Sequence, residues 1–133
     1  YKYNEEVVTV ALNEECKKVP YVLGRLFAVL EDLQEKANPG INSTIKDRYF
    51  NSACANPSMT FPLLTKLANT HLKKISSQKG TVIYFEKLIG ELMNKLEVDD
   101  NAMPVRLSLP EQGEFVLGYY HQVQKRYEKK EEK

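Results

Sequence analysis

Residues 20–40 read PYVLGRLFAVLEDLQEKANPG, and this stretch decides the fold. Its large apolar residues recur at the spacing of one helical face, at Leu23, Leu26, Phe27, Leu30 and Leu33. Pro20 suits the first turn of a helix, and Asn38-Pro39-Gly40 ends the periodic pattern. Val22 and Val29 widen the apolar stripe. The stretch therefore predicts a long helix that is buried on two sides in a helical bundle.

Two residues of this helix stand apart from its stripe. Gly24 has no side chain, so it would let a neighbouring helix approach closely. Arg25 is a cation near the start of the helix, and we take it as a candidate contact for an anionic partner.

Downstream of this helix, residues 41–57 predict a short helix that Asn42 or Ser43 caps and that Asn56-Pro57 ends. Ile45, Tyr49 and Ala53 fall on its buried side. Since Lys46 and Arg48 cannot both share that side, at least one of them should reach solvent.

Residues 58–76 predict a further helix. Pro62 is expected in its first turn, because a proline deeper inside would remove a hydrogen bond. Its apolar stripe consists of Leu64, Leu67, Ala68, Leu72 and Ile75.

Two more helices follow a polar loop at residues 76–80. Residues 81–98 keep the helical period through Phe85, Leu88 and Leu92, so we favour a helix there over a strand at Val82–Phe85.

Ser108 and Glu111 form a capping box with a proline in the first turn, which predicts the start of the last helix. On that helix we expect the buried face to carry Val116, Tyr120, Val123 and Tyr127, with Phe115 and Tyr119 at its edge.

The predicted fold class is all-α: a compact antiparallel bundle of four to five helices. The bundle would span residues 19–127, after a leader at residues 1–18 and before a charged, frayed tail at residues 128–133. The leader is expected to be extended or disordered. Its run Val7–Val10 could be an edge strand, a disordered segment or a helical turn.

Length and composition fit one ordinary globular domain. The chain has 133 residues, of which 42% are hydrophobic and 28% charged, and no apolar run is long enough to span a membrane. Neither end resembles a signal peptide. Cys16 and Cys54 lack any metal-ligand spacing, so we expect a reduced, cytoplasmic protein without a zinc site.

Positive charge is concentrated in the middle of the chain. Residues 38–80 carry a net charge of +5, whereas the segments on either side each carry −2. Such a block suggests a polyanion as partner, although lysines on a solvated face are the alternative. With two arginines from the flanks added, the candidate nucleic-acid-binding residues are Arg25, Lys46, Arg48, Lys66, Lys73, Lys74, Lys79 and Arg126.

The sequence gives little indication of a catalytic site. His71 and His121 are the only histidines, and neither has a partner at a spacing typical of a catalytic or metal site. We therefore expect no enzyme, no cofactor and no metal; a hydrolase that uses His71 or His121 is the remaining enzymatic alternative. Tyr119 and Tyr120 could stack on bases, or could pack in the core.

Three blocks of the sequence together resemble one known family. They are YVLGRLFAVLEDLQEKAN, then NPGINSTIKDRYFNSACANP with FPLLTKLANTHLKK, then LSLPEQGEFVLGYYHQVQK. In this order they closely resemble the C-terminal region of the large subunit of the subtype I-C CRISPR Cascade complex, over about residues 19–126. One departure is Val123, where that family is expected to have an arginine.

The resemblance implies a small helical bundle that is either the end of the large subunit or a separately translated small subunit; a chain that begins just before the first block looks like the latter. It further implies several copies that pack on the backbone and large subunits and support the target and non-target DNA strands of the R-loop, with only indirect contact to the crRNA. The family's matching motif residues are Gly24, Arg25, Asn38, Pro39, Gly40, Asp47, Arg48, Tyr49, Phe50, His71, Gln112, Gly113, Gly118, Tyr119, Tyr120, His121 and Gln122.

The functional hypothesis is a non-catalytic subunit that binds DNA backbone without sequence preference while it packs on partner subunits. The alternative is a protein-interaction module whose basic face docks on acidic surfaces of its partners.

Overall fold

A computed structural model describes residues 12–97 and 103–132, with residue 97 and residues 128–132 as backbone only. Within these ranges the elements are α2 (Val19–Ala37), α3 (Ile45–Ala55), α4 (Pro57–Lys74), α5 (Lys79–Glu97) and α6 (Leu109–Glu132). All regular structure in the described part is helical, which confirms the predicted all-α bundle. The candidate strand at Val7–Val10 lies outside the described residues.

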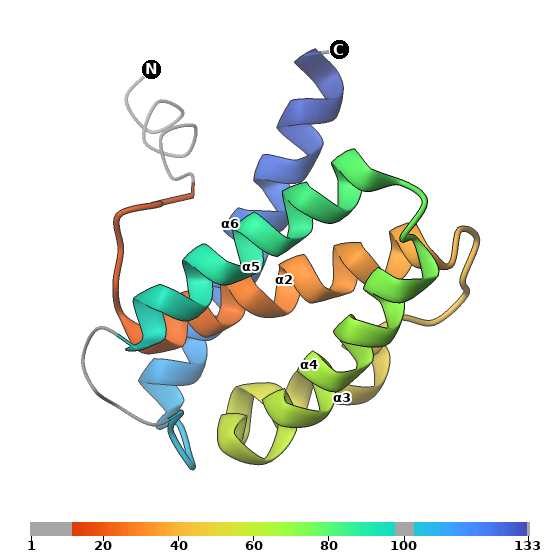
Figure 1. Ribbon diagram of the computed structural model, residues 1–133. Coiled ribbons are helices and arrows are strands. Elements are labelled where there is room, and N and C mark those ends of the chain that lie inside the picture. Colours follow the sequence, from red (N-terminus) through yellow and green to blue (C-terminus); the bar gives the residue numbers. More distant parts are fainter. Residues whose placement is uncertain (1–11, 98–102, 133) are drawn as a thin grey trace.

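Helix α2 is the centre of the molecule. Every residue from Pro20 to Glu31 is buried, and α3, α4, α5 and α6 all contact this helix. In Figure 1 it runs through the middle, with α5 along one side, α3 and α4 on the other, and α6 crossing it. The long apolar stretch of the sequence is therefore enclosed by the other helices, as its wide stripe predicts.

The crossing of α2 and α6 depends on two glycines. A Cβ atom at Gly24 would overlap the carbonyl oxygen of Phe115 and lie 2.8 Å from the nitrogen of Tyr119. A Cβ atom at Gly118 would overlap the carbonyl oxygen of Tyr21. The two backbones are thus in direct contact, which confirms that Gly24 admits a close neighbour and identifies α6 as that neighbour.

Five aromatic rings fill the core beside this crossing. Phe27 on α2 is fully buried and makes edge-to-face contacts with four rings from α3, α4 and α6, at centroid distances of 5.4–6.5 Å. This geometry is the one that aromatic quadrupoles favour. The four partners are Phe50, Phe61, Phe115 and Tyr119.

The predicted buried face of the last helix was wrong. Phe115 and Tyr119 are 0% and 4% exposed, whereas Tyr120 and Tyr127 are 48% and 52% exposed. Gly118 has to face α2 for the backbones to touch. Phe115 and Tyr119 lie on the same side of the helix as Gly118, so they turn toward the core as well. A glycine, rather than the largest apolar side chains, sets the orientation of α6.

The starts of α3 and α4 also differ from the prediction. Thr44, rather than Asn42 or Ser43, caps α3, because Asp47 lies three residues later and completes a capping box. Helix α4 already begins at Pro57, so Pro62 lies inside the helix and not in its first turn. Pro62 is exposed, and its missing amide leaves the carbonyl group four residues earlier, in the first turn of α4, without an intrahelical donor.

The other helix boundaries agree with the prediction in part. The Ser108–Glu111 capping box is present, with the Ser108 amide donating to Glu111 Oε1 at 2.8 Å, and residues 82–85 are helical as predicted. Lys79 and Gly80, expected in a loop, are the first residues of α5, and α6 continues to Glu132 through the segment expected to be a frayed tail. Among the described residues, no helix is long and apolar enough to cross a bilayer.

A buried carboxylate joins three of the helices. Glu31 is 6% exposed and accepts hydrogen bonds from the hydroxyl of Tyr119 and, at 2.6 Å, from the hydroxyl of Thr44. Because Thr44 caps α3, the Glu31 carboxylate connects α2 both to α6 and to the start of α3. Burial, together with the hydrogen bond to Glu31, raises the pKa of Tyr119 above its ordinary value.

The raised pKa of Tyr119 predicts a loss of stability in alkali. An unfolded tyrosine titrates near pH ~10, whereas folded Tyr119 keeps its proton above that pH. As pH rises from 10 toward the folded pKa, the unfolded chain therefore binds fewer protons than the folded chain, and the free energy of unfolding falls. Urea unfolding at pH 9 and pH 11 should show a smaller decrease for Tyr119→Phe than for the wild type. Equal decreases would contradict the assignment.

Candidate nucleic-acid interface

The central cations lie on three successive helices. Lys46 and Arg48 are on α3, Lys66, Lys73 and Lys74 are on α4, and Lys79 is the first residue of α5. All six belong to the segment with a net charge of +5. Lys46 is half-buried and the other five are exposed.

None of these six cations has a carboxylate partner within 4 Å among the described residues. The five ion pairs there all involve cations outside the central block, such as Lys18 with Glu114 and Lys125 with Glu14. Asp47, the single acid of the central block, accepts a hydrogen bond from the backbone nitrogen of Thr44 as part of the capping box. The central positive charge is therefore not neutralised by carboxylates within this part of the molecule, and it remains available to an external anion.

The loop at residues 38–44 connects α2 to α3. Gly40 has a φ of 82°, a conformation that favours glycine, so the chain can turn back immediately after α2. Lys74 Nζ donates to the side-chain oxygen of Asn38, which fixes the end of α4 against the start of the loop. The backbone nitrogen of Ile45 donates to Gln34 Oε1 at 2.7 Å, which fixes the other end of the loop. The NPG turn thus has a defined position between α2, α3 and α4.

A shallow depression of about 330 Å³ lies beside this loop. Arg48 lines it together with Leu67 of α4, and the loop contributes Ser43 and Thr44. Leu67 and Lys74 are seven residues apart on one face of α4, so Lys74 lies on the side of α4 that borders the depression. Two cations from different helices therefore flank a polar loop, an arrangement that can hold backbone phosphates through charge and hydrogen bonds.

Lys46 differs from the other five cations. Its Nζ donates to the Tyr120 hydroxyl at 3.0 Å and lies 5.1–5.8 Å from the ring centroids of Phe50, Tyr119 and Tyr120. The hydrogen bond to Tyr120 is the largest cause that raises its pKa. Part of this charge therefore stabilises the contact between α3 and α6.

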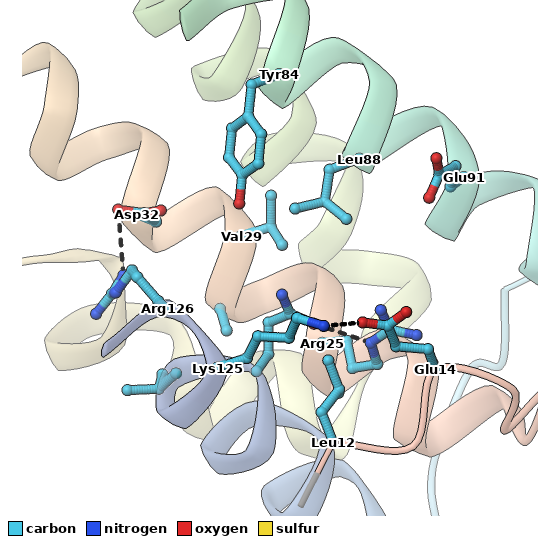
Figure 2. A pocket seen from close by; sticks show the side chains of 13 residues that line it. Leu12, Glu14, Arg25, Val29, Asp32, Tyr84, Leu88, Glu91, Lys125 and Arg126 are labelled. Carbon is cyan, nitrogen blue, oxygen red and sulfur yellow. Dashed lines mark hydrogen bonds and ion pairs between the residues drawn. The ribbon is translucent and has the colours of Figure 1, made fainter. Parts of the chain in front are cut away.

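The two predicted flanking arginines lie away from this surface. Arg25 is 4% exposed and donates from Nε to Gln122 Oε1 at 2.9 Å. Arg126 is paired with Asp32 at 3.3 Å and with Glu35 at 3.9 Å. Both line a separate pocket between α2, α5 and α6 (Figure 2). Sequence reasoning could not separate them from the surface cations, because their neighbours come from distant parts of the chain.

Three of the four aromatic and histidine candidates make hydrogen bonds within the bundle, whereas His71 Nε2 is buried without a hydrogen-bond partner among the described residues. Tyr119 is in the core, and Tyr120 exposes about half of its surface beside Lys46. His121 Nδ1 lies 2.9 Å from the Tyr21 hydroxyl, and the two rings meet edge to face. For His71, burial and then the charge of Lys74 lower the pKa, which favours the neutral ring. Within the described ranges, no group of three potential ligands could hold a metal ion.

The fold and these cations define a class of protein: a small all-helical bundle whose central cations have no carboxylate partner within 4 Å among the described residues. A protein-family model described as CRISPR-associated protein (Cas_Csd1) matches residues 1–127. The chain therefore belongs to the Cas_Csd1 family of CRISPR-associated proteins, which confirms the type I-C family predicted from the three sequence blocks. Membership of this family implies a component of the Cascade complex. No curated protein matches the chain significantly.

Proposed function

We propose that this bundle acts as a non-catalytic small-subunit module of a cytoplasmic type I-C Cascade complex, present in several copies and supporting the DNA strands of the R-loop through their phosphates. The observation that carries the proposal is the set of central cations without carboxylate partners in the described structure. Two of them, Arg48 and Lys74, flank a polar loop whose hydroxyl and amide groups can donate to phosphate oxygens. Family membership supports nucleic acid as the polyanion.

The mechanism requires charge and shape rather than base recognition. Each lysine or arginine that approaches a phosphate releases a condensed counterion, so affinity depends on salt and not on sequence. Guide RNA pairing would supply sequence specificity in the complex, and this module would hold the backbone of the displaced or paired strand. The hydrogen bond of His121 with Tyr21 supports a structural role for that histidine, in line with a non-catalytic module.

Charge reversal on α4 tests the proposal. Lys73→Glu with Lys74→Glu should weaken binding of the isolated protein to single-stranded DNA and make it less dependent on salt. If each lysine neutralises one phosphate, the slope of log affinity against log salt should fall in magnitude by about 1.4. Fluorescence anisotropy with a labelled oligonucleotide of mixed sequence, at several salt concentrations, gives both quantities.

The matched control reverses two exposed lysines outside the central block, Lys17→Glu with Lys87→Glu, and so changes the net charge by the same amount. If the control lowers DNA affinity as much as the α4 variant does, only total charge matters, and the assigned surface is wrong. Binding of the wild type that does not change with salt would also contradict the mechanism.

One observation favours protein contacts as a second function. Met59, Val105 and Leu109 are 77%, 68% and 81% exposed. Met59 and Val105 lie close together, because the Ser58 nitrogen donates to the Pro104 carbonyl at 3.0 Å. Exposed apolar side chains that gather at one end of a bundle fit a protein partner better than a phosphate backbone.

A pull-down of the other Cascade subunits with the α4 variant separates the two functions. Intact assembly with weakened DNA binding supports the DNA role of the cations. Lost assembly with normal DNA binding supports the alternative, in which the basic surface docks on acidic partner surfaces.

A further inference from the structure

A second site lies between α2, α5 and α6. It is a pocket of about 150 Å³, lined on one side by Leu12 and Glu14 of the leader. Figure 2 shows charged side chains from the leader and all three helices around it. Three of its lining residues are cations and three are acids: Arg25, Lys125, Arg126, Glu14, Asp32 and Glu91.

Two of the three cations already have carboxylate partners. Lys125 Nζ pairs with Glu14, and Arg126 pairs with Asp32 at 3.3 Å. Both pairs connect α6 to another segment, since Glu14 is in the leader and Asp32 is on α2. The carboxylates of Glu14 and Asp32 therefore neutralise the positive charges of Lys125 and Arg126 within the protein.

Arg25 forms no ion pair within 4 Å among the described residues, although Glu14 and Glu91 are near enough to act on its charge electrostatically. Its side chain is almost fully buried, with 4% of the residue's surface exposed, and among the described residues its Nε donates a single hydrogen bond, to the neutral amide oxygen of Gln122. Its Nη1 atom is buried and has no hydrogen-bond partner among the described residues. A buried guanidinium nitrogen without an acceptor is costly, so a built cavity beside it points to an external acceptor.

The size and charge of the pocket indicate which chemical group accepts a hydrogen bond from Arg25. Its volume suits a group of a few heavy atoms and is too small for a nucleotide. A guanidinium binds a carboxylate through two parallel hydrogen bonds. Glu14, Asp32 and Glu91 also line the pocket, and they would repel a phosphodiester strand with its many charges more strongly than a single carboxylate.

We propose that Arg25 forms a binding site for one carboxylate, supplied by an aspartate or glutamate side chain of a partner protein. The protein source of this carboxylate rests on the proposed packing of the bundle on other subunits. The site itself does not depend on DNA binding, because Arg25 lies apart from the cations of the central block.

Sodium acetate is the probe. The Arg25 Nε–Hε signal in ¹H–¹⁵N NMR spectra of the 133-residue chain should shift saturably with acetate, and sodium chloride at the same ionic strength should not reproduce the shift. Gln122→Glu supplies an internal carboxylate next to Arg25 Nε, so it should weaken the acetate response about tenfold or more. Arg106→Gln, which removes an exposed arginine outside the pocket, should leave the response unchanged.

Three results would overturn the proposal: no saturable shift, the same shift with chloride, or an undiminished response in Gln122→Glu. A tighter response to inorganic phosphate than to acetate would also overturn it and would indicate a phosphate of nucleic acid instead. Because these titrations contain no DNA, and Lys73→Glu with Lys74→Glu leaves the pocket intact, failure here is distinguishable from failure of the DNA-binding proposal.

Discussion

Gly118→Ala is expected to lower the free energy of unfolding by about 3 kcal/mol or more. The new Cβ atom would overlap the carbonyl oxygen of Tyr21 and lie 2.9 Å from its carbonyl carbon. Both are backbone atoms of α2, which is held on every side by other helices, so neither can move away as a flexible side chain could. The expected result is that α6 separates from α2 or that the bundle unfolds in much less urea, measured by circular dichroism.

Gly113→Ala is the matched control, because it makes the same change in the same helix. A Cβ atom at Gly113 meets nothing within 4 Å, so alanine should be neutral or should stabilise the helix by up to ~1 kcal/mol. Opposite effects at positions 113 and 118 would establish the backbone contact. Equal effects would show that helix propensity, rather than close approach, determines the result.

Phe27→Ala is expected to cost about 3–5 kcal/mol of unfolding free energy. Phe27 is fully buried and touches rings from α3, α4 and α6, so its removal leaves a cavity at the junction of four helices. The enclosing rings are held by separate helices and cannot all collapse into the space. Urea unfolding should show a lower midpoint, with the slope nearly unchanged if the transition stays two-state.

Leu117→Ala provides the comparison for this core variant. Leu117 is 52% exposed on α6, and surface substitutions of this kind usually change stability by less than ~0.5 kcal/mol. A loss at Leu117 as large as that at Phe27 would mean that the exposed side of α6 is not a free surface. It would then contradict the described packing of the bundle.

The local features of the fold could be predicted from the sequence. Apolar spacing identified the stripes of α2, α4 and α5, because helical periodicity is a property of residues three and four positions apart. The capping box at Ser108 and Glu111 is equally local. The starts of α3 and α4 were predicted wrongly because local signals competed. Three polar residues could cap α3, and Asn56-Pro57 both ends α3 and begins α4.

The candidate interface could be predicted only in part. Counting charges located the central block, and the structure agrees that its cations lack carboxylate partners in the described ranges. Counting could not show that Arg25 is buried against Gln122, 97 residues away, or that Arg126 is paired with Asp32. It also missed the pocket that these two arginines line.

The sequence by itself therefore determined the helices, most of their apolar stripes and the position of the positive charge, since each follows from neighbours within a few residues. Only the tertiary structure decided which face of α6 is buried and which cations remain free. The reason is physical: the close approach of the two backbones at Gly24 and at Gly118 sets the rotation of α6 about its own axis. That rotation buries Tyr119 and Gln122, exposes Tyr120, and provides Arg25 with its hydrogen-bond partner on α6.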